Sequence, residues 1–200
     1  MKIYNFEQGT EEWFSIKKLK FSASDATAIG NKGAGLETLI KKKVLETIVE
    51  KKDNYTDEHI ERGNELEPIA RAKYEFEKGV EVLEVGFIEY NDYCGCSPDG
   101  LVNQDGGIEI KARNDEKHFD FILGSKLDSG TDWQIQMSLF ITGRKWWDFI
   151  SYNPNFKQSI VIIRIYPDEE RQLKIKEGID YAVKKLKQIL ENKNVVLELE

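Results

Sequence analysis

The spacing of hydrophobic residues changes near residue 80, and this change constrains the fold more than any other feature of the sequence. Between residues 36 and 50, apolar residues recur every three or four positions, which predicts an amphipathic helix. Between residues 80 and 111 they alternate with polar residues, which predicts strands. A chain that passes from helices to strands and back is typical of an α/β domain. We therefore expect a small mixed β-sheet flanked by helices.

Capping and turn residues set the limits of the expected elements. Helices are predicted at 10–20, after Ser22 or Ser24 up to a glycine-rich loop at 30–35, at 36–50, from Asp57 past Pro68 to Lys78, at 115–124, at 131–142, and from Asp168 to about residue 191. Strands are predicted at 80–85, 87–90, 101–102, 108–111, 146–152 and 159–166, with a turn at 98–100. Pro68 is expected to kink its helix or to open a new one.

Several classes of protein are disfavoured by what the sequence contains. Its 200 residues show no internal repeat and no long linker, so we expect one domain over residues 1–200. Neither a dinucleotide-binding glycine motif nor a phosphate-binding loop is found. Cys94 and Cys96 are too close on a strand to form a disulfide. Without a long apolar run or an apolar leader, we expect a soluble, cytoplasmic protein that does not enter a membrane.

The charge is acidic overall but unevenly distributed. Asp and Glu outnumber Lys and Arg by 36 to 29, which gives a formal net charge of -7. Nucleic-acid binding requires basic surface, so this balance disfavours it. Residues 13–52, however, carry nine lysines against four acidic residues. Many carboxylates also suit a protein that binds a hard cation, so composition alone does not decide between these partners.

The predicted strands 101–102 and 108–111 flank a turn at 104–107 and together suggest a hairpin. The most informative polar residues lie in and beside it. Asp99 follows a proline at the 98–100 turn, and Glu109-Ile110-Lys111 lies on the return strand. Residues two apart on a strand share a face, so Glu109 and Lys111 point the same way, and a hairpin can bring Asp99 beside them. Two carboxylates and the main-chain carbonyl of Ile110 form an oxygen-only ligand set suited to Mg²⁺ or Mn²⁺. Beside a metal, Lys111 can orient water and stabilise charge on a phosphate, as phosphodiester hydrolysis requires.

The same residues also allow simpler interpretations. A Glu-x-Lys triplet arises about once by chance in a chain of this length, and most such triplets lie on a solvated strand face. Glu67 on its helix can be a third metal ligand or a surface residue, and Gln134 can face the site or the solvent. His59 and His118 lack the spacing of metal ligands, and no role is predicted for them. From the residues alone, these alternatives remain open.

Five blocks of sequence, spread over nearly the whole chain, are informative together. They are Glu7-Gln-Gly-Thr-Glu-Glu-Trp13 with Ser22-Ala-Ser24, residues 63–76, Cys96-Ser-Pro-Asp-Gly-Leu101, Glu109-Ile-Lys111, and the stretch from Gln134-Ile-Gln136 to Pro154. In their order and their gaps, these blocks resemble the lambda-exonuclease/YqaJ-type viral recombinase family. That family belongs to the restriction-endonuclease-like, PD-(D/E)XK nucleases, so the resemblance implies a restriction-endonuclease-like core.

The resemblance also implies roles for single residues. The catalytic and metal-binding residues it implies are Asp99, Glu109, Ile110 through its carbonyl, Lys111 as the catalytic lysine, Glu67 as a further site carboxylate, and Gln134.

A second group of residues is implied to hold the terminal 5′-phosphate of DNA. These residues are Lys17, Ser24 and Ser97. Lys17 departs from the family pattern, which has an arginine there, so the charge is kept but the bidentate fork is lost. Lys18 or Lys20 can share this task.

The activity implied is that of a Mg²⁺-dependent 5′→3′ exonuclease. It would degrade one strand of linear double-stranded DNA to mononucleotides and leave 3′ tails for phage-type recombination. The resemblance implies two Mg²⁺ ions, replaceable by Mn²⁺, a single-strand annealing protein as partner, and a ring-shaped homotrimer with the basic residues towards the DNA. The alternatives are a structure-specific or restriction-type endonuclease of the same fold and a non-catalytic DNA-end-binding protein.

Overall fold

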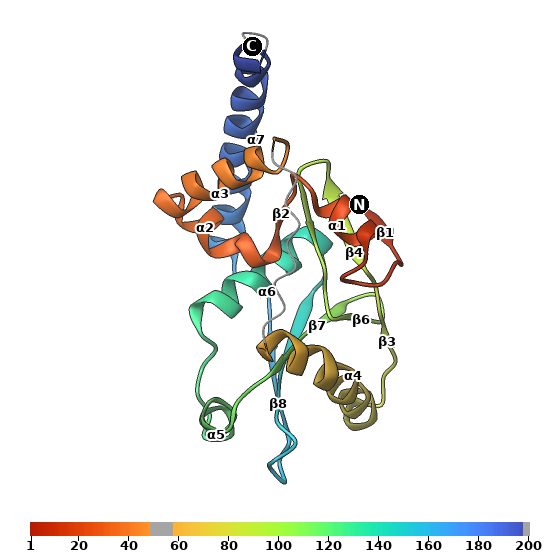
Figure 1. Ribbon diagram of the computed structural model, residues 1–200. Coiled ribbons are helices and arrows are strands. Elements are labelled where there is room, and N and C mark those ends of the chain that lie inside the picture. The colour runs from red at the N-terminus through yellow and green to blue at the C-terminus, as the bar shows by residue number, and fades with distance from the viewer. Residues whose placement is uncertain (49–57, 198–200) are drawn as a thin grey trace.

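The computed structural model describes residues 1–48 and 58–197. Its helices are α1 (Glu11–Lys17), α2 (Ala26–Asn31), α3 (Ala34–Leu45), α4 (Glu58–Lys78), α5 (Asp115–Ile122), α6 (Ser129–Thr142) and α7 (Glu169–Leu197), with a 3-10 turn η1 (Ala23–Asp25) (Figure 1). Its strands are β1 (Lys2–Tyr4), β2 (Phe21–Ser22), β3 (Val82–Leu83), β4 (Phe87–Asn91), β5 (Cys94–Cys96), β6 (Gly100–Val102), β7 (Gly106–Ala112), β8 (Trp146–Tyr152) and β9 (Ile160–Ile165).

The strands form two sheets, where one was expected from the sequence. The smaller sheet has the order β1-β4-β5-β2 and the larger one β3-β6-β7-β8-β9. Both sheets are mixed. In the smaller sheet β2 and β5 are parallel, and in the larger sheet β7 and β8 are parallel. All the other strand pairs described in the two sheets are antiparallel. The prediction of a mixed α/β fold flanked by helices is confirmed, and the second sheet is an addition to it.

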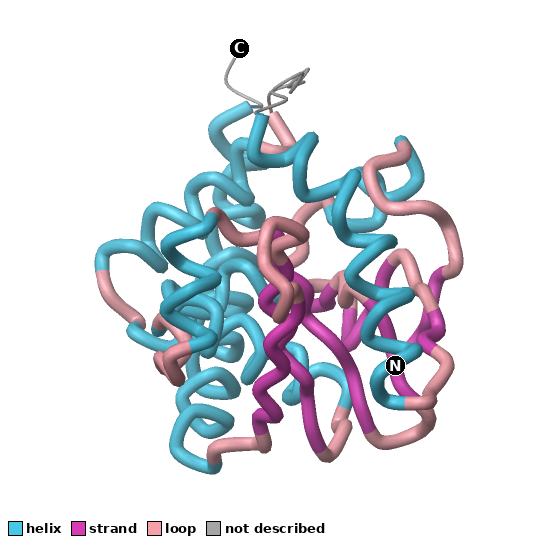
Figure 2. The backbone as a smooth tube through the Cα atoms, turned by 90° about the horizontal axis from the view of Figure 1, so that it is seen from below, coloured by secondary structure: helices cyan, strands magenta, loops and turns pink. Residues whose placement is uncertain are grey.

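The larger sheet is covered on both faces, and Figure 2 shows helices on both sides of the strands. On β8, Trp147 and Phe149 pack into a core layer that contains buried residues of α6. Ile150 packs on the other face, in a layer with residues of α4. On β7, Ile108 and Ile110 belong to the α4 layer. The residues between and after them therefore point to the α6 side of the sheet.

Several element boundaries differ from the prediction. The helix predicted at 10–20 ends at Lys17, because the chain leaves helical geometry at Lys18 and Leu19 has a φ of 63°. Most of the glycine-rich segment at 30–35 is helical, since α2 and α3 extend into it from both sides. The third predicted helix ends at Leu45 rather than residue 50. The predicted cap Asp57 and two of the lysines counted above, at 51 and 52, lie outside the described residues.

The short strands were the hardest to predict. β1, β2 and β5 were missed because two or three residues are too few to show an alternating pattern. The strand predicted at 80–85 forms ladder pairs only at Val82 and Leu83. Pro68 lies inside α4 and does not open a new helix. The last helix begins after Asp168, whose carboxylate accepts a hydrogen bond from the Arg171 amide at 2.9 Å, as predicted, and runs on to Leu197.

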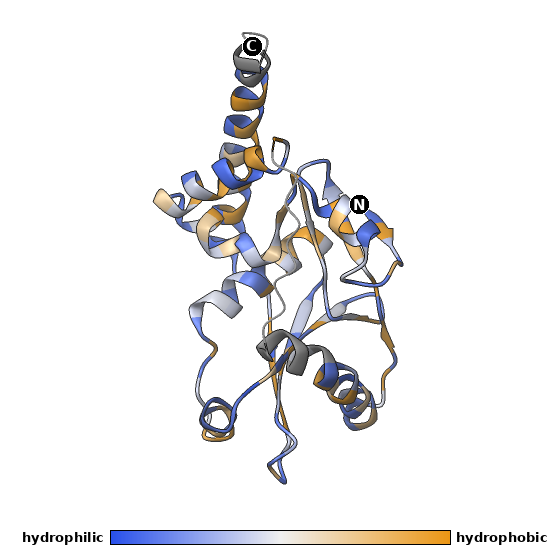
Figure 3. Ribbon diagram, in the orientation of Figure 1, coloured by the Kyte–Doolittle hydropathy of each residue, from blue (hydrophilic) through white to orange (hydrophobic). Residues whose placement is uncertain are grey.

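Helices α2 and α7 pack closely because of a glycine. A Cβ atom added to Gly178 would lie 2.2 Å from the carbonyl oxygen of Ile29, so no larger residue fits at this crossing. Figure 3 shows hydrophobic and hydrophilic residues alternating along α7, as expected for a helix with one buried face. No helix within residues 1–48 and 58–197 combines the length and apolar character that a membrane crossing requires.

Candidate active site

The hairpin places Asp99 opposite Glu109, as the sequence predicted. Gly100 pairs with Ile108 in the β6–β7 ladder, so Asp99 lies at the end of that ladder, next to Glu109. Oδ2 of Asp99 accepts a hydrogen bond from the main-chain amide of Ile110 at 2.5 Å. This bond fixes the carboxylate of the turn against β7.

Glu109 is the centre of the polar cluster. Its Oε1 atom lies 2.6 Å from Nζ of Lys111 and accepts a hydrogen bond of 2.7 Å from Nε2 of Gln134 on α6. Glu109 is only 2% exposed. The alternative of a solvated strand face is therefore wrong for this residue, and Gln134 faces the cluster rather than the solvent.

A third carboxylate approaches from α4. Oε1 of Glu67 lies 2.6 Å from Arg71, whose Nε atom donates to the main-chain carbonyl of Asp99 at 3.2 Å. The charge of Glu67 also acts on the Asp99 carboxyl group. The structure thus brings Glu67, Asp99, Glu109, Lys111 and Gln134 together from α4, the β6 turn, β7 and α6.

The acidic groups of the cluster influence one another electrostatically. Burial raises the pKa of Asp99 well above its usual value, and the neighbouring Glu109 and Glu67 raise it further. Burial also raises the pKa of Glu67, although Arg71 opposes this. For Lys111, burial lowers the pKa, but Glu109 and Asp99 outweigh burial, so the pKa is raised. The lysine is therefore held in its charged form beside the carboxylates.

The chemistry of the donor set fits a hard divalent cation. The available ligands are oxygens, from Asp99, Glu109, Glu67 and the Ile110 carbonyl, and such ligands suit Mg²⁺ and Mn²⁺. A cation there would relieve the repulsion that raises the pKa of Asp99. In the described part of the chain, no three Asp, Glu, His or Cys side chains are already grouped as ligands. Each carboxylate instead binds a protein donor, which a cation would have to displace in part.

Two of the predicted phosphate-binding residues, Lys17 and Ser97, contact the same tryptophan, Trp13. Nε1 of Trp13 donates to Oγ of Ser97 at 2.9 Å, and Nζ of Lys17 lies 3.5 Å from the centre of the Trp13 ring. Burial lowers the pKa of Lys17 to about 8, and the charge of Lys43 contributes. Ser97 is two residues before Asp99, so the Cα atoms of these two residues lie within about 7 Å of each other.

Ser24 lies in a neighbouring part of the surface. Its hydroxyl is 2.8 Å from that of Ser22, and the charge of the next residue, Asp25, acts on Lys17. Ser24 also lines a hollow of about 530 Å³ between α2 and α3. Lys18 is exposed, whereas Lys20 is buried and bound to Glu89 at 3.0 Å. Lys20 is therefore not available to share a phosphate, contrary to one of the predicted options.

Arg71 and Trp13, which contact predicted site residues, had not been assigned a role from the sequence. Arg71 stands four residues after Glu67, a spacing that places both on one side of a helix. Trp13 lies in one of the blocks that resemble the family. His118, for which no role was predicted, is a buried histidine with both ring nitrogens bound, one to Ser151 at 2.9 Å and one to the carbonyl of Gln158 at 2.8 Å.

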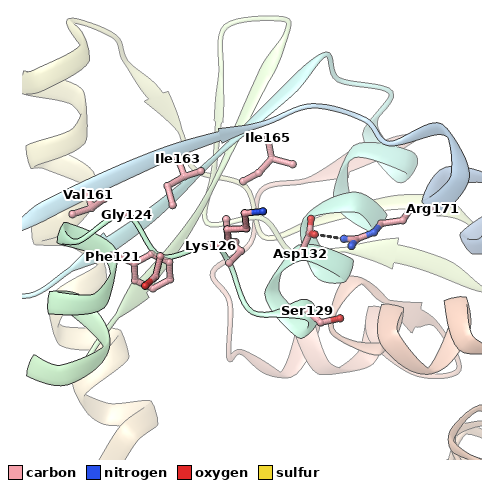
Figure 4. Close-up of a pocket in the computed structure, with 11 residues that line it drawn as sticks. Phe121, Gly124, Lys126, Ser129, Asp132, Val161, Ile163, Ile165 and Arg171 are labelled. Atoms are coloured by element: carbon pink, nitrogen blue, oxygen red, sulfur yellow. Dashed lines mark hydrogen bonds and ion pairs between the residues drawn. The ribbon is translucent and has the colours of Figure 1, made fainter.

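A larger cavity lies apart from the cluster. It measures about 710 Å³ and is bounded by β9, the segment after α5 and the start of α7, with the Asp132–Arg171 ion pair at one side (Figure 4). None of its lining residues belongs to the carboxylate cluster or to the predicted phosphate group. The candidate site is therefore a polar cluster beside β7 and not this cavity.

The fold agrees with that of exonucleases whose structures are known. The chain is similar to an alkaline exonuclease (LHK-Exo) from Laribacter hongkongensis, with 31% identity over 96% of this chain and 100% of that chain and a TM-score of 0.86. A structure of LHK-Exo in complex with dAMP matches with a TM-score of 0.85. A phage-related exonuclease from Haemophilus somnus 129PT shares the fold at 17% identity, with a TM-score of 0.67 over 88% of this chain and 97% of that one.

The sequence itself defines the family. Residues 12–145 match the model of the YqaJ-like viral recombinase domain, and the chain belongs to this family. No curated protein matches the sequence. The resemblance inferred from the five sequence blocks is thus confirmed.

Proposed function

We propose that this protein is a Mg²⁺-dependent 5′→3′ exonuclease that degrades one strand of linear double-stranded DNA to mononucleotides. The observation that carries the proposal is the convergence of Lys111 and Gln134 on one oxygen of Glu109, beside Asp99. An amine next to a set of oxygen ligands is what metal-assisted phosphodiester hydrolysis requires. The similarity to an alkaline exonuclease supports the same reaction class.

In this proposal, the residues of the cluster have distinct tasks. Asp99, Glu109 and the Ile110 carbonyl would hold the metal, with Glu67 as a further carboxylate. Bound divalent ions, two by the proposal, supply charge neutralisation at the phosphate and lower the pKa of an attacking water. Lys111 orients that water and stabilises the charge that develops on the phosphate oxygens. Gln134 keeps Glu109 in one orientation through its hydrogen bond.

The direction of degradation would come from the phosphate-binding group. Lys17, Ser24 and Ser97 would hold the 5′-phosphate of the strand while the next phosphodiester bond lies at the cluster. Because Ser97 is two residues from Asp99, the two sites are close enough for consecutive phosphates of one strand. This spacing supports release of one nucleotide at a time, and so does the structure of the related LHK-Exo in complex with dAMP, a mononucleotide.

The wider proposal concerns partners. We propose that one nuclease domain, residues 1–200, acts on DNA ends in the cytoplasm of a bacterial or phage-infected cell, as a homotrimer, and passes its 3′ tails to a single-strand annealing protein. These points rest on the family resemblance. Sedimentation of the purified protein, alone and with linear duplex, tests the trimer.

A digestion experiment tests the activity. Linear duplex labelled at one 5′ or 3′ end, with 5′-phosphate or 5′-hydroxyl termini, is incubated with Mg²⁺, with Mn²⁺, or with a chelator, beside closed circular DNA. We expect mononucleotides and early loss of the 5′ label from linear DNA in both metals, and no reaction with the chelator or on circles. Cutting of circular DNA would favour an endonuclease. Binding to ends without degradation would favour a non-catalytic end-binding protein.

A further inference from the structure

Arg71 is a buried cation whose side chain joins three segments of the chain. It lies on α4 and is 8% exposed. One terminal nitrogen lies 2.6 Å from Oε1 of Glu67, the other lies 2.6 Å from Oε2 of Glu84, and Nε donates to the main-chain carbonyl of Asp99 at 3.2 Å. All three nitrogens of the guanidinium group are therefore engaged, each with a different segment.

These contacts link two parts of the carboxylate cluster that no strand pairing connects. Glu67 is carried by α4, whereas Asp99 lies in the turn before β6. Carboxylates gathered in a buried site repel one another, because little solvent screens their charges. A fixed cation between the helix and the turn opposes that repulsion and sets the distance between them.

We propose that Arg71 is a positioning residue that holds Glu67 and the Asp99 turn in one arrangement and thereby determines the affinity of the cluster for divalent cations. The inference rests on the proposed function, in which these carboxylates bind metal. Arg71 itself is not a catalytic residue, because its nitrogens are occupied by protein acceptors. It acts through Glu67 and the backbone of Asp99.

Arginine suits this position for a geometric reason. Its planar fork presents donors in three fixed directions, whereas a lysine is a single point charge on a flexible chain. Arg71→Lys therefore keeps the charge and loses the geometry. This matters for the test, because a neutral variant would also make the cluster more negative, and that change by itself would attract cations.

The first measurement is calorimetric titration of the purified protein with Mn²⁺ alone, without DNA. We expect Arg71→Lys to raise the dissociation constant for Mn²⁺ about 10-fold or more, as found for residues that orient metal ligands. In the digestion assay at saturating Mg²⁺, the same variant is expected to lower kcat with little change in KM for DNA. Arg164→Lys is the matched control, because Arg164 makes two hydrogen bonds of 2.8 Å to a carboxylate, Asp148, that is not part of the cluster.

A second pair of variants keeps the test valid if Arg71→Lys does not fold. Glu84 contacts Arg71 from outside the cluster, and its side chain is 69% exposed. Glu81 is also exposed and makes no ion pair within the described residues. Glu84→Ala and Glu81→Ala remove the same charge three positions apart, but only Glu84 forms an ion pair with Arg71. We expect Glu84→Ala to raise the Mn²⁺ dissociation constant about threefold and Glu81→Ala to leave it unchanged.

Defined outcomes overturn the inference. A folded Arg71→Lys variant that binds Mn²⁺ as tightly as the wild type would overturn it. An equal loss of Mn²⁺ affinity in Arg164→Lys would also overturn it, because it would point to a general structural effect. If Arg71→Lys does not fold, equal affinities of the two alanine variants would also overturn it. Failure of the proposed function looks different: the wild-type protein would then neither bind Mn²⁺ nor degrade linear duplex.

Discussion

Gln134 on α6 donates a hydrogen bond of 2.7 Å to Glu109 on β7, and so joins a helix to the strand that carries the candidate catalytic residues. The acceptor oxygen also faces Lys111. Replacing Gln134 with leucine keeps the size of the side chain but removes this donor, so that Glu109 loses one of the two contacts of its Oε1 atom. We expect the rate of DNA degradation to fall about 10- to 100-fold, with DNA binding unchanged in an anisotropy assay. An unaltered rate would show that Gln134 does not orient Glu109.

Replacement of Lys111 is predicted to lower the rate of DNA degradation more than replacement of any other single residue. In the proposed mechanism its ammonium group, beside Glu109, orients the attacking water and stabilises charge on the phosphate. Lys111→Ala should lower kcat by at least about 100-fold, while binding of linear duplex, measured without added metal, persists. Full activity in this variant would refute the catalytic role of the lysine.

The lowered pKa of Lys17 predicts that recognition of 5′-phosphate ends depends on pH. Its pKa is lowered to about 8, mainly by burial, so the free enzyme loses this positive charge as the pH rises through that value. The ratio of kcat/KM for 5′-phosphate over 5′-hydroxyl ends should therefore be high below this pKa and decline above it, since kcat/KM reports the free enzyme.

Lys17→Arg is the control for this prediction. Arginine stays charged throughout the accessible pH range and restores a bidentate fork, so the preference for 5′-phosphate should no longer decline. Identical pH profiles for the two proteins would exclude Lys17 as the titrating group.

Tyr74 allows stability to be separated from activity. Its hydroxyl donates at 2.8 Å to Asp148, a fully buried carboxylate that also binds Arg164. Tyr74→Phe should lower the free energy of unfolding by about 1.5–3 kcal/mol, as measured by urea denaturation. The rate of DNA degradation under native conditions should stay near that of the wild type, because Asp148 faces α4, on the opposite side of the sheet from Glu109. A large loss of activity without loss of stability would contradict this separation.

The parts of the site that could be predicted from the sequence are the local ones. Asp99, Glu109 and Lys111 lie on one hairpin, where turn chemistry and strand alternation fix their relative positions. Glu67 and Gln134 come from helices far away in the chain, and the residues alone left their placement open. Only the similarity to a family supplied it, since no local rule says which side of a helix meets a distant strand.

The fold was predictable to a similar extent. Long helices and the strands β7 and β8 show clear periodicity, whereas β1 and β2 are too short to do so. Arg71 was overlooked because an arginine four residues after a glutamate is common on helix surfaces. Its importance follows from the Asp99 carbonyl and Glu84, which tertiary structure alone brings to it.

The alternation along β7 has a consequence for how the gene can change. Ile108 and Ile110 fill one hydrophobic layer, while Glu109 and Lys111 serve the opposite side of the same strand. A deletion of one residue in the turn before β7 would slide the strand by one position and exchange the two sets. That one deletion would remove both the site residues and the core residues of β7 from their positions. The length of this turn is therefore as tightly constrained as the identity of the residues that follow it.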